Sequence, residues 1–151
     1  MKAPLDTQRL QEFALLCAER ALPVFEKQYP DNMWPRKALG TALEFLVGDA
    51  TKREVADDNF EAAYAARYVA HHGSRASYAA SAVFYAVLST YTDDPVRAVR
   101  EAARCAILAA YVPTIPTRAA ERDWQRETLL SLVSCEHRET LRGSDLGAFL
   151  P

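Results

Sequence analysis

Two phenols and an imidazole recur at regular spacing near the middle of the chain. Tyr64, Tyr68 and His72 follow one another at intervals of four residues, which on a helix places them on one face. Together with Arg67 they could line a pocket between helices for a small ligand. Aromatic rows with this spacing are more often half-buried core. The pattern therefore leaves a ligand pocket and ordinary packing as alternatives.

Four carboxylates form the clearest charged cluster of the sequence: Glu54, Asp57, Asp58 and Glu61. Such a run is usually a solvated helix entrance, where negative charge complements the helix dipole. It would also suit the basic surface of a protein partner such as a nuclease, whose approach it would steer. We take these four residues as candidates for partner binding.

Motifs for catalysis and metal binding are missing from the sequence. It has no Gly-rich phosphate loop, no nucleophile elbow and no HExxH motif. His71 and His72 are neighbours that point about 100° apart on a helix, so they cannot both bind one metal ion. Their place before Gly73 suits a helix C-terminus instead. We expect no catalytic residue, no metal and no cofactor.

The composition is that of a packed globular protein. Of 151 residues, 50% are hydrophobic and 25% charged, and only five are glycine, so one helical domain over residues 1–151 is expected. The net charge of −2 lacks the basic excess that nucleic-acid binding needs. Because no window approaches the roughly 20 apolar residues of a membrane span, we expect a cytoplasmic protein. Cys17, Cys105 and Cys135 lack metal spacing and are predicted to be buried free thiols.

Periodicity and capping residues predict a compact all-α bundle of about six helices. Asp6 should cap the first helix, which Pro23 interrupts, and Asn59 should cap the third after a polar connector. Ser74 should open the fourth helix, and Asp94 should cap the fifth. The other helices are expected over residues 35–47, 60–72, 74–90, 95–111 and 117–135, the last capped by Thr117. Residues 136–151 read as an irregular tail. The helix after Ser74 carries no charged residue from position 76 to 88, so it should lie at the centre.

The N-terminal half carries a recognisable signature. Residues 17–26 read CAERALPVFE, residues 29–31 read YPD and residues 35–38 read PRKA. This pattern, with the Ala-rich helices up to about Pro113, resembles a family of all-helical putative immunity proteins from bacterial polymorphic toxin systems. The resemblance implies a protein that binds a toxin and occludes it without catalysis. The chain departs from the family at Cys105 and Tyr111, where histidines are expected.

The signature can also be explained by the fold it produces. Its charged and proline residues are Glu19, Arg20, Pro23, Asp31, Pro35 and Arg36. If the first two helices pack antiparallel around the Pro30 turn, Glu19 and Arg36 could pair across the hairpin and set its register. We therefore expect these residues to be structural rather than ligand contacts.

Three functions from different classes remain open at this stage. The first is the immunity-type binding protein, whose partner is a protein toxin. The second is a scaffolding protein that forms a homodimer through an Ala-rich face, because small residues let helices approach closely. The third is a small-molecule binder or enzyme that uses Tyr64, Arg67, Tyr68 and His72 in a pocket.

Overall fold

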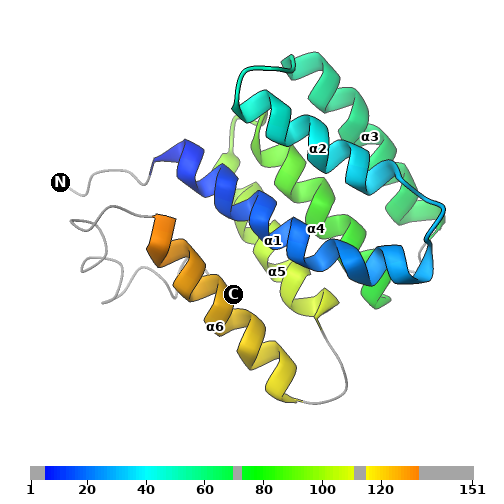
Figure 1. Ribbon diagram of the computed structural model, residues 1–151, viewed down its shortest axis with the longest axis vertical. Coiled ribbons are helices and arrows are strands. Elements are labelled where there is room, and N and C mark those ends of the chain that lie inside the picture. The colour runs from blue at the N-terminus through cyan, green and yellow to red at the C-terminus, as the bar shows by residue number, and fades with distance from the viewer. Residues whose placement is uncertain (1–5, 70–72, 111–114, 133–151) are drawn as a thin grey trace.

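A computed structural model describes residues 6–69, 73–110 and 115–132, with side chains for all of these except 67, 68 and 115–118. Within these ranges the chain forms six α-helices and no strand (Figure 1), so the predicted all-α fold is confirmed. In order they are α1 (Thr7–Gln28), α2 (Trp34–Leu46), α3 (Lys52–Tyr68), α4 (Arg75–Ser89), α5 (Pro95–Ala109) and α6 (Ile115–Leu132). None of the described helices is long and apolar enough to cross a membrane.

Helix α4 lies at the centre of the bundle, as its uncharged sequence predicts. It contacts α1, α2, α3 and α5, and its buried residues lie on several sides of the helix: Ala76, Ser77, Ala79, Ala80, Ala82, Val83, Ala86, Val87 and Ser89. Small side chains on this helix let its neighbours approach closely, because the distance between packed helices depends on the side chains at the contact. Larger residues of α1, among them Phe13, Leu22 and Phe25, are fully buried and complete the core.

The predicted caps of α1, α4 and α5 are confirmed. Asp6 accepts a hydrogen bond from the Gln8 amide at 3.1 Å, Ser74 accepts one from Ser77 at 3.1 Å, and Asp94 accepts one from Arg97 at 3.2 Å. Each bond satisfies an amide that has no partner inside its own helix. The turns after α2 and α3 contain Gly48 and Gly73, whose φ angles of 87° and 83° lie in a region that other residues rarely adopt.

The prediction for α3 was wrong at its beginning. The helix begins at Lys52, not near Phe60, and its cap is Thr51, which accepts a hydrogen bond from the Glu54 amide at 3.2 Å. The Glu54 carboxylate accepts the Thr51 amide in return, at 2.6 Å, which completes a capping box. Asn59, the predicted cap, lies inside the helix, is buried, and donates to the Tyr91 hydroxyl at 2.7 Å. The polar residues from Lys52 to Asn59 therefore belong to a helix rather than to a connector.

The prediction for α6 also placed its beginning too late. The helix begins at Ile115, so Thr117 lies within its first turn and is not the cap. Pro116 is compatible with this, because a proline in the first turn removes an amide that has no helical partner. Pro23 lies within α1, which continues to Gln28. The predicted end of α6 at Cys135 and the tail at 136–151 lie outside the described residues.

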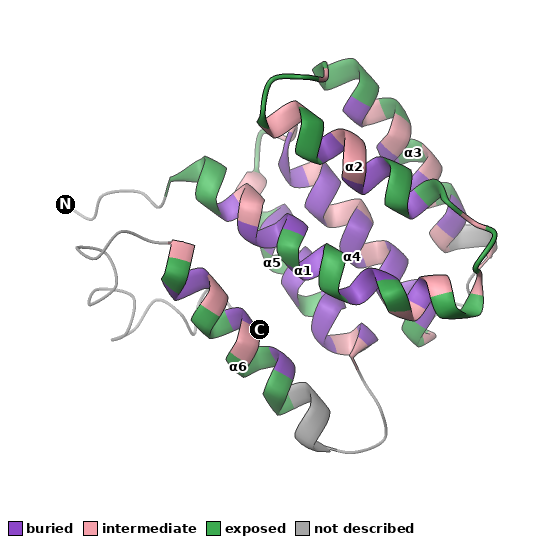
Figure 2. Cartoon of the chain, in the orientation of Figure 1, coloured by how far each residue is buried: buried purple, intermediate pink, exposed green. Residues whose placement is uncertain are grey.

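The pair α2 and α3 lies on one side of the bundle, and α6 lies on another. Figure 1 shows α2 and α3 side by side, and α6 on the other side of α1 and α5. Helix α6 contacts α1 and α5, whereas α3 contacts α2 and α4. Exposed residues run along the outer side of α3 (Figure 2). The α2 and α3 pair therefore presents a surface of its own, distant from α6.

Candidate partner-binding surface

Charged and polar contacts hold α2 and α3 together as an antiparallel pair. The Lys37 ammonium lies 3.4 Å from an oxygen of Asp58 and 3.8 Å from one of Glu61. One turn further along α2, the Thr41 hydroxyl donates a hydrogen bond to Asp58. Later residues of α2 thus meet earlier residues of α3. This pairing aligns the two helices and decides which carboxylates remain exposed.

The four carboxylates of the acidic cluster have different environments. The Asp58 side chain is only 13% exposed and faces α2. Glu54 is exposed, and its hydrogen bonds with the Thr51 backbone and side chain lower the pKa of its carboxyl. Asp57 is exposed, and the Glu61 side chain keeps 43% of its surface in solvent. Asp57 thus combines exposure with freedom from a role in building α3 or joining it to α2, and Glu61 is exposed while making only the longer, 3.8 Å contact with Lys37 of α2.

Apolar side chains lie on the same face of α3 as these two carboxylates. Asp57, Phe60, Glu61 and Tyr64 follow the three-and-four spacing of a single helical stripe, which we call the outer stripe. Phe60 is 71% exposed and Tyr64 is 43% exposed. The Trp34 ring, at the start of α2, packs edge-on against Tyr64 with 5.9 Å between the ring centroids and is itself 40% exposed. Three aromatic rings and two carboxylates are thus brought together on one side of the molecule.

Two of the three aromatic residues of this surface, Phe60 and Trp34, were missed from the sequence. Phe60 was expected to begin a helix, and Trp34 was placed just before the second helix, which was expected over residues 35–47. A large apolar residue beside four carboxylates was the available signal, because aromatic residues amid polar neighbours mark interaction surfaces as well as cores. Which side of α3 faces solvent depends on how this helix packs against α2 and α4, and the sequence alone does not specify that packing.

The residues of the predicted ligand pocket are only partly described. Tyr64 belongs to the outer stripe, packed against Trp34. The side chains of Arg67 and Tyr68, and the whole of His72, lie outside the described residues, so the pocket stays a prediction. Among the residues that are described, no three His, Cys, Asp or Glu side chains could hold a metal ion together.

Arg20 of the signature joins α1 to α6. Its Nε donates a hydrogen bond to Glu121 at 2.7 Å, and its guanidinium lies 4.4 Å from the centroid of the Trp124 ring. Gln125, fully buried on α6, donates to the same carboxylate at 3.3 Å and to the Ala103 carbonyl of α5 at 3.0 Å. Cys17, also on α1, is buried, and this burial raises the pKa of its thiol well above its ordinary value. Arg20 thus connects α1 to α6.

The predicted pair between Glu19 and Arg36 is wrong, because Arg36 pairs with a different glutamate. Arg36 forms a two-pronged contact with Glu26, with Nε and Nη2 at 2.7 and 2.6 Å from the two carboxylate oxygens. This hydrogen bonding lowers the pKa of Glu26 and raises that of Arg36. Glu26 and Arg36 lie equally far in sequence from Asp31 in the turn, whereas Glu19 lies two helical turns further back. The hairpin geometry therefore selects Glu26.

The remaining signature residues occupy the hairpin between α1 and α2. Pro35 is buried in the first turn of α2, as predicted, while Pro23 on α1 and Asp31 in the turn are exposed.

At one of the two positions where histidines were expected, Cys105 is buried, and this burial raises its pKa to about 11. Tyr111 lies outside the described residues. Burial of Cys105 places this departure from the signature in the core.

Comparison with known proteins identifies one family. Residues 3–132 match the model of the family described as "Imm-5 like putative immunity protein". No curated protein and no solved structure matches the chain.

Proposed function

This chain belongs to the family of Imm-5 like putative immunity proteins, and on that premise we propose that it neutralises a protein toxin by binding and occluding it. The contact is made by the outer stripe of α3 together with Trp34. The protein needs no chemistry of its own for this role. The sequence signature, the match over residues 3–132 and the surface formed by α2 and α3 support the proposal.

The exposed aromatic residues of the outer stripe carry this proposal. Binding energy at protein interfaces is concentrated in a few buried anchors, among which tyrosine and tryptophan are enriched, surrounded by a polar rim. Phe60, at 71% exposure, leaves most of a large apolar side chain in water. Burying it against a partner would recover that hydrophobic free energy. Tyr64 and Trp34 extend the apolar area beside it.

The flanking carboxylates define the chemistry of the partner. Asp57 and Glu61 lie on the same stripe as Phe60 and Tyr64, so the partner surface should pair an apolar pocket with basic residues around it. Enzymes that act on nucleic acid carry such basic surfaces, because they bind phosphate groups. We propose a toxin of this class, whose substrate-binding surface the outer stripe would cover.

The test begins by capturing the toxin from the source cell on the purified protein and identifying what stays bound in high salt. The dissociation constant is then measured for three variants. Phe60→Ala and Tyr64→Ala should each weaken binding by about tenfold, and Val47→Ala should not. Val47 is a matched control because it is 72% exposed but lies directly after α2, at its C-cap, outside the outer stripe. If all three variants bind with equal affinity, the outer stripe is not part of the interface.

The charge of the surface is tested through the association rate. Asp57→Ser with Glu61→Ser should slow association with the toxin and flatten its dependence on salt. Asp123→Ser with Glu127→Ser is the matched control, because these two exposed carboxylates have the same four-residue spacing on α6. Glu54 and Asp58 are left intact, since Glu54 belongs to the α3 cap and Asp58 contacts both Lys37 and Thr41 of α2, whereas Glu61 makes only the longer contact with Lys37, at 3.8 Å. An unchanged rate in the first variant would exclude electrostatic steering by the stripe.

The same surface could instead bury its aromatic residues against a second copy of the chain, which is the scaffolding alternative. Light scattering over a range of concentrations separates the two functions. A monomer at high concentration supports toxin binding over self-association. A dimer that Phe60→Ala dissociates would assign the outer stripe to a homodimer instead.

A further inference from the structure

Helix α6 contributes little to the hydrophobic core. Among the side chains described for this helix, the buried ones are two polar and two apolar residues: Glu121, Gln125, Leu129 and Leu130. In the buried hydrophobic cluster of the described residues, Leu129 and Leu130 are the members from α6, and the others come from α1 to α5. The first five helices therefore share a continuous core in which α6 has a small part.

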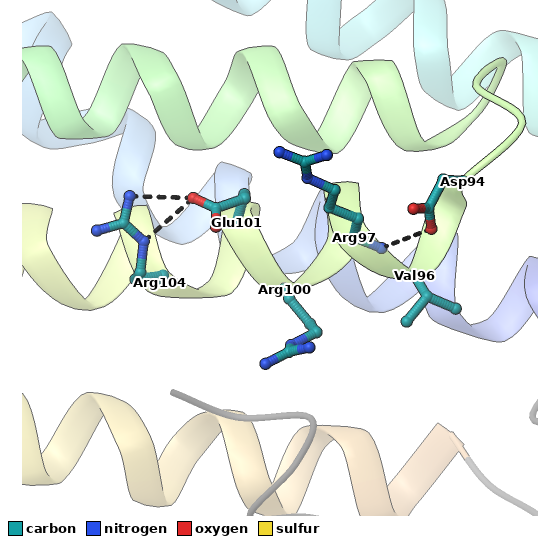
Figure 3. Close-up of a pocket in the computed structure, with 6 residues that line it drawn as sticks. All are labelled: Asp94, Val96, Arg97, Arg100, Glu101 and Arg104. Carbon is teal, nitrogen blue, oxygen red and sulfur yellow. Dashed lines mark hydrogen bonds and ion pairs between the residues drawn. The ribbon is translucent and has the colours of Figure 1, made fainter.

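Polar contacts hold much of α6 against α1 and α5. Glu121 accepts a hydrogen bond from the Arg20 Nε at 2.7 Å, and Gln125 donates to the Ala103 carbonyl at 3.0 Å. Such bonds add a modest net free energy, because water satisfies the same groups once they separate. Figure 3 shows Arg100 extending from α5 on the side where α6 lies, but this exposed side chain forms no ion pair within the described part of the chain. Arg100 therefore adds no charge pair between α5 and α6.

One buried polar atom of α6 lacks a hydrogen-bond partner. The Gln125 side chain is fully buried, and its Nε2 donates both of the hydrogen bonds that it forms, to Ala103 and to Glu121. Its Oε1 accepts no hydrogen bond from the described residues. A buried acceptor without a partner destabilises the state in which it is buried. Release of α6 would bring this oxygen into water, which offsets part of the free energy lost with the other contacts.

A buried thiol of α1 lies close to α6. Cys17 precedes Arg20 by three residues, so the two side chains lie near one another on the helix surface. Burial raises the pKa of Cys17, and the charge of Glu121 on α6 raises it further. The charges that act on the buried Cys105 thiol come instead from its own helix, α5. The two thiols can therefore distinguish an opening of α6 from an unfolding of the whole bundle.

We infer that α6 undocks from the bundle as a unit while α1 to α5 stay folded, and that this opening exposes Cys17. Proteins open locally in such cooperative parts, and an element with few buried apolar contacts opens at a lower free energy than the whole chain unfolds. The opening requires no residue of the outer stripe. Its success or failure is therefore independent of the proposed toxin contact.

Thiol labelling of the full chain carrying Cys135→Ser tests this opening. The reagent, methyl methanethiosulfonate, is kept dilute enough that the labelling rate is proportional to its concentration, so that the rate measures the population of open molecules. Mass spectrometry follows Cys17 and Cys105 separately, each relative to its own rate in the urea-unfolded chain. Cys17 should react at least about tenfold faster than Cys105. Low concentrations of urea should accelerate Cys105 more steeply, because global unfolding exposes more surface than undocking does.

A core substitution separates undocking from global unfolding. Val83 is fully buried on the central helix α4, so Val83→Ala should destabilise the docked and undocked states alike relative to the unfolded chain. It should accelerate labelling of Cys105 by at least about tenfold and change that of Cys17 by less than about twofold. Val47→Ala is the matched control, because it makes the same substitution at a residue that is 72% exposed. It should change neither rate.

Hydrogen exchange provides a second measurement that does not depend on cysteine. The amides between Glu121 and Leu130 on α6 should exchange faster than those of α4, and Val83→Ala should accelerate only the amides of α4. The inference is overturned if Cys17 reacts no faster than Cys105, or if Val83→Ala accelerates both thiols, or both helices, by the same factor. In each of these cases α6 would open only when the whole bundle unfolds.

Discussion

The guanidinium of Arg20 on α1 stacks over the ring of Trp124 on α6, 4.4 Å from its centroid. The same guanidinium donates to Glu121, one turn before the tryptophan, at 2.7 Å. One arginine of the family-like signature thus contacts both a ring and a carboxylate of a helix about a hundred residues later in the chain. This arrangement attaches α6 to the body of the bundle and explains why an arginine suits this position better than a lysine.

Replacing Arg20 should loosen α6. Arg20→Ala removes the stacking contact and leaves the Glu121 side chain, which is only 7% exposed, without its cation. We expect the free energy of unfolding in urea to fall by about 1–3 kcal/mol. Arg9→Ala is the control, because Arg9 pairs with Glu12 on the exposed side of the same helix and should cost less than about 1 kcal/mol. Equal losses in the two variants would show that the Arg20 contacts add nothing to an ordinary surface pair.

The pair between Glu26 and Arg36 should make stability depend on acid pH. Its hydrogen bonds lower the pKa of Glu26 in the folded protein, so the stabilisation is present above the ordinary glutamate pKa and is lost as the pH falls through the lowered value. At neutral pH, Glu26→Gln should reduce the free energy of unfolding by about 0.5–1 kcal/mol. Urea unfolding of both proteins should show this difference shrinking below about pH 4. A difference that stays constant down to pH 2 would contradict the pairing.

The buried thiols should be chemically silent in the folded protein. Cys105 has a pKa of about 11, so roughly one molecule in a thousand carries the thiolate at pH 8. In a Cys135→Ser background, a thiol reagent should modify Cys17 and Cys105 at least about a hundredfold more slowly than it modifies the urea-unfolded chain. Because burial raises both pKa values, the free energy of unfolding should stay level below the unfolded thiol pKa and fall as the pH rises above it. Rapid modification of the native protein at pH 8 would refute the burial of both residues.

The capping box should stabilise the first turn of α3. Thr51→Ala removes the oxygen that accepts the Glu54 amide and should lower the free energy of unfolding by about 1 kcal/mol. The control is Asp49→Ala, at an exposed residue before the helix, which should change stability by less than about 0.5 kcal/mol. Far-ultraviolet circular dichroism during urea unfolding provides the measurement. If the two variants are equally stable, Thr51 does not cap the helix.

Some features of the bundle could be predicted because their physical causes are local. Asp6, Ser74 and Asp94 each cap a helix through an amide two or three residues later, and such bonds depend on neighbouring residues alone. The beginning of α3 was equally local, since Thr51 and Glu54 have the spacing of a capping box. It was assigned wrongly because the charged run up to Asp58 resembled a connector. Val55, buried on that first turn, was too weak a signal to outweigh it.

The sequence by itself determined that this chain is an all-α bundle around α4, because an uncharged helix of small residues can be stable only when other helices surround it. It also contained the signature of the family. Only the tertiary structure decided that Arg36 meets Glu26, that Arg20 meets Trp124, and that Phe60 stays exposed beside Asp57 and Glu61. These contacts join residues on different helices or depend on which helical face is covered. They follow from how the helices pack, which no local pattern of residues specifies.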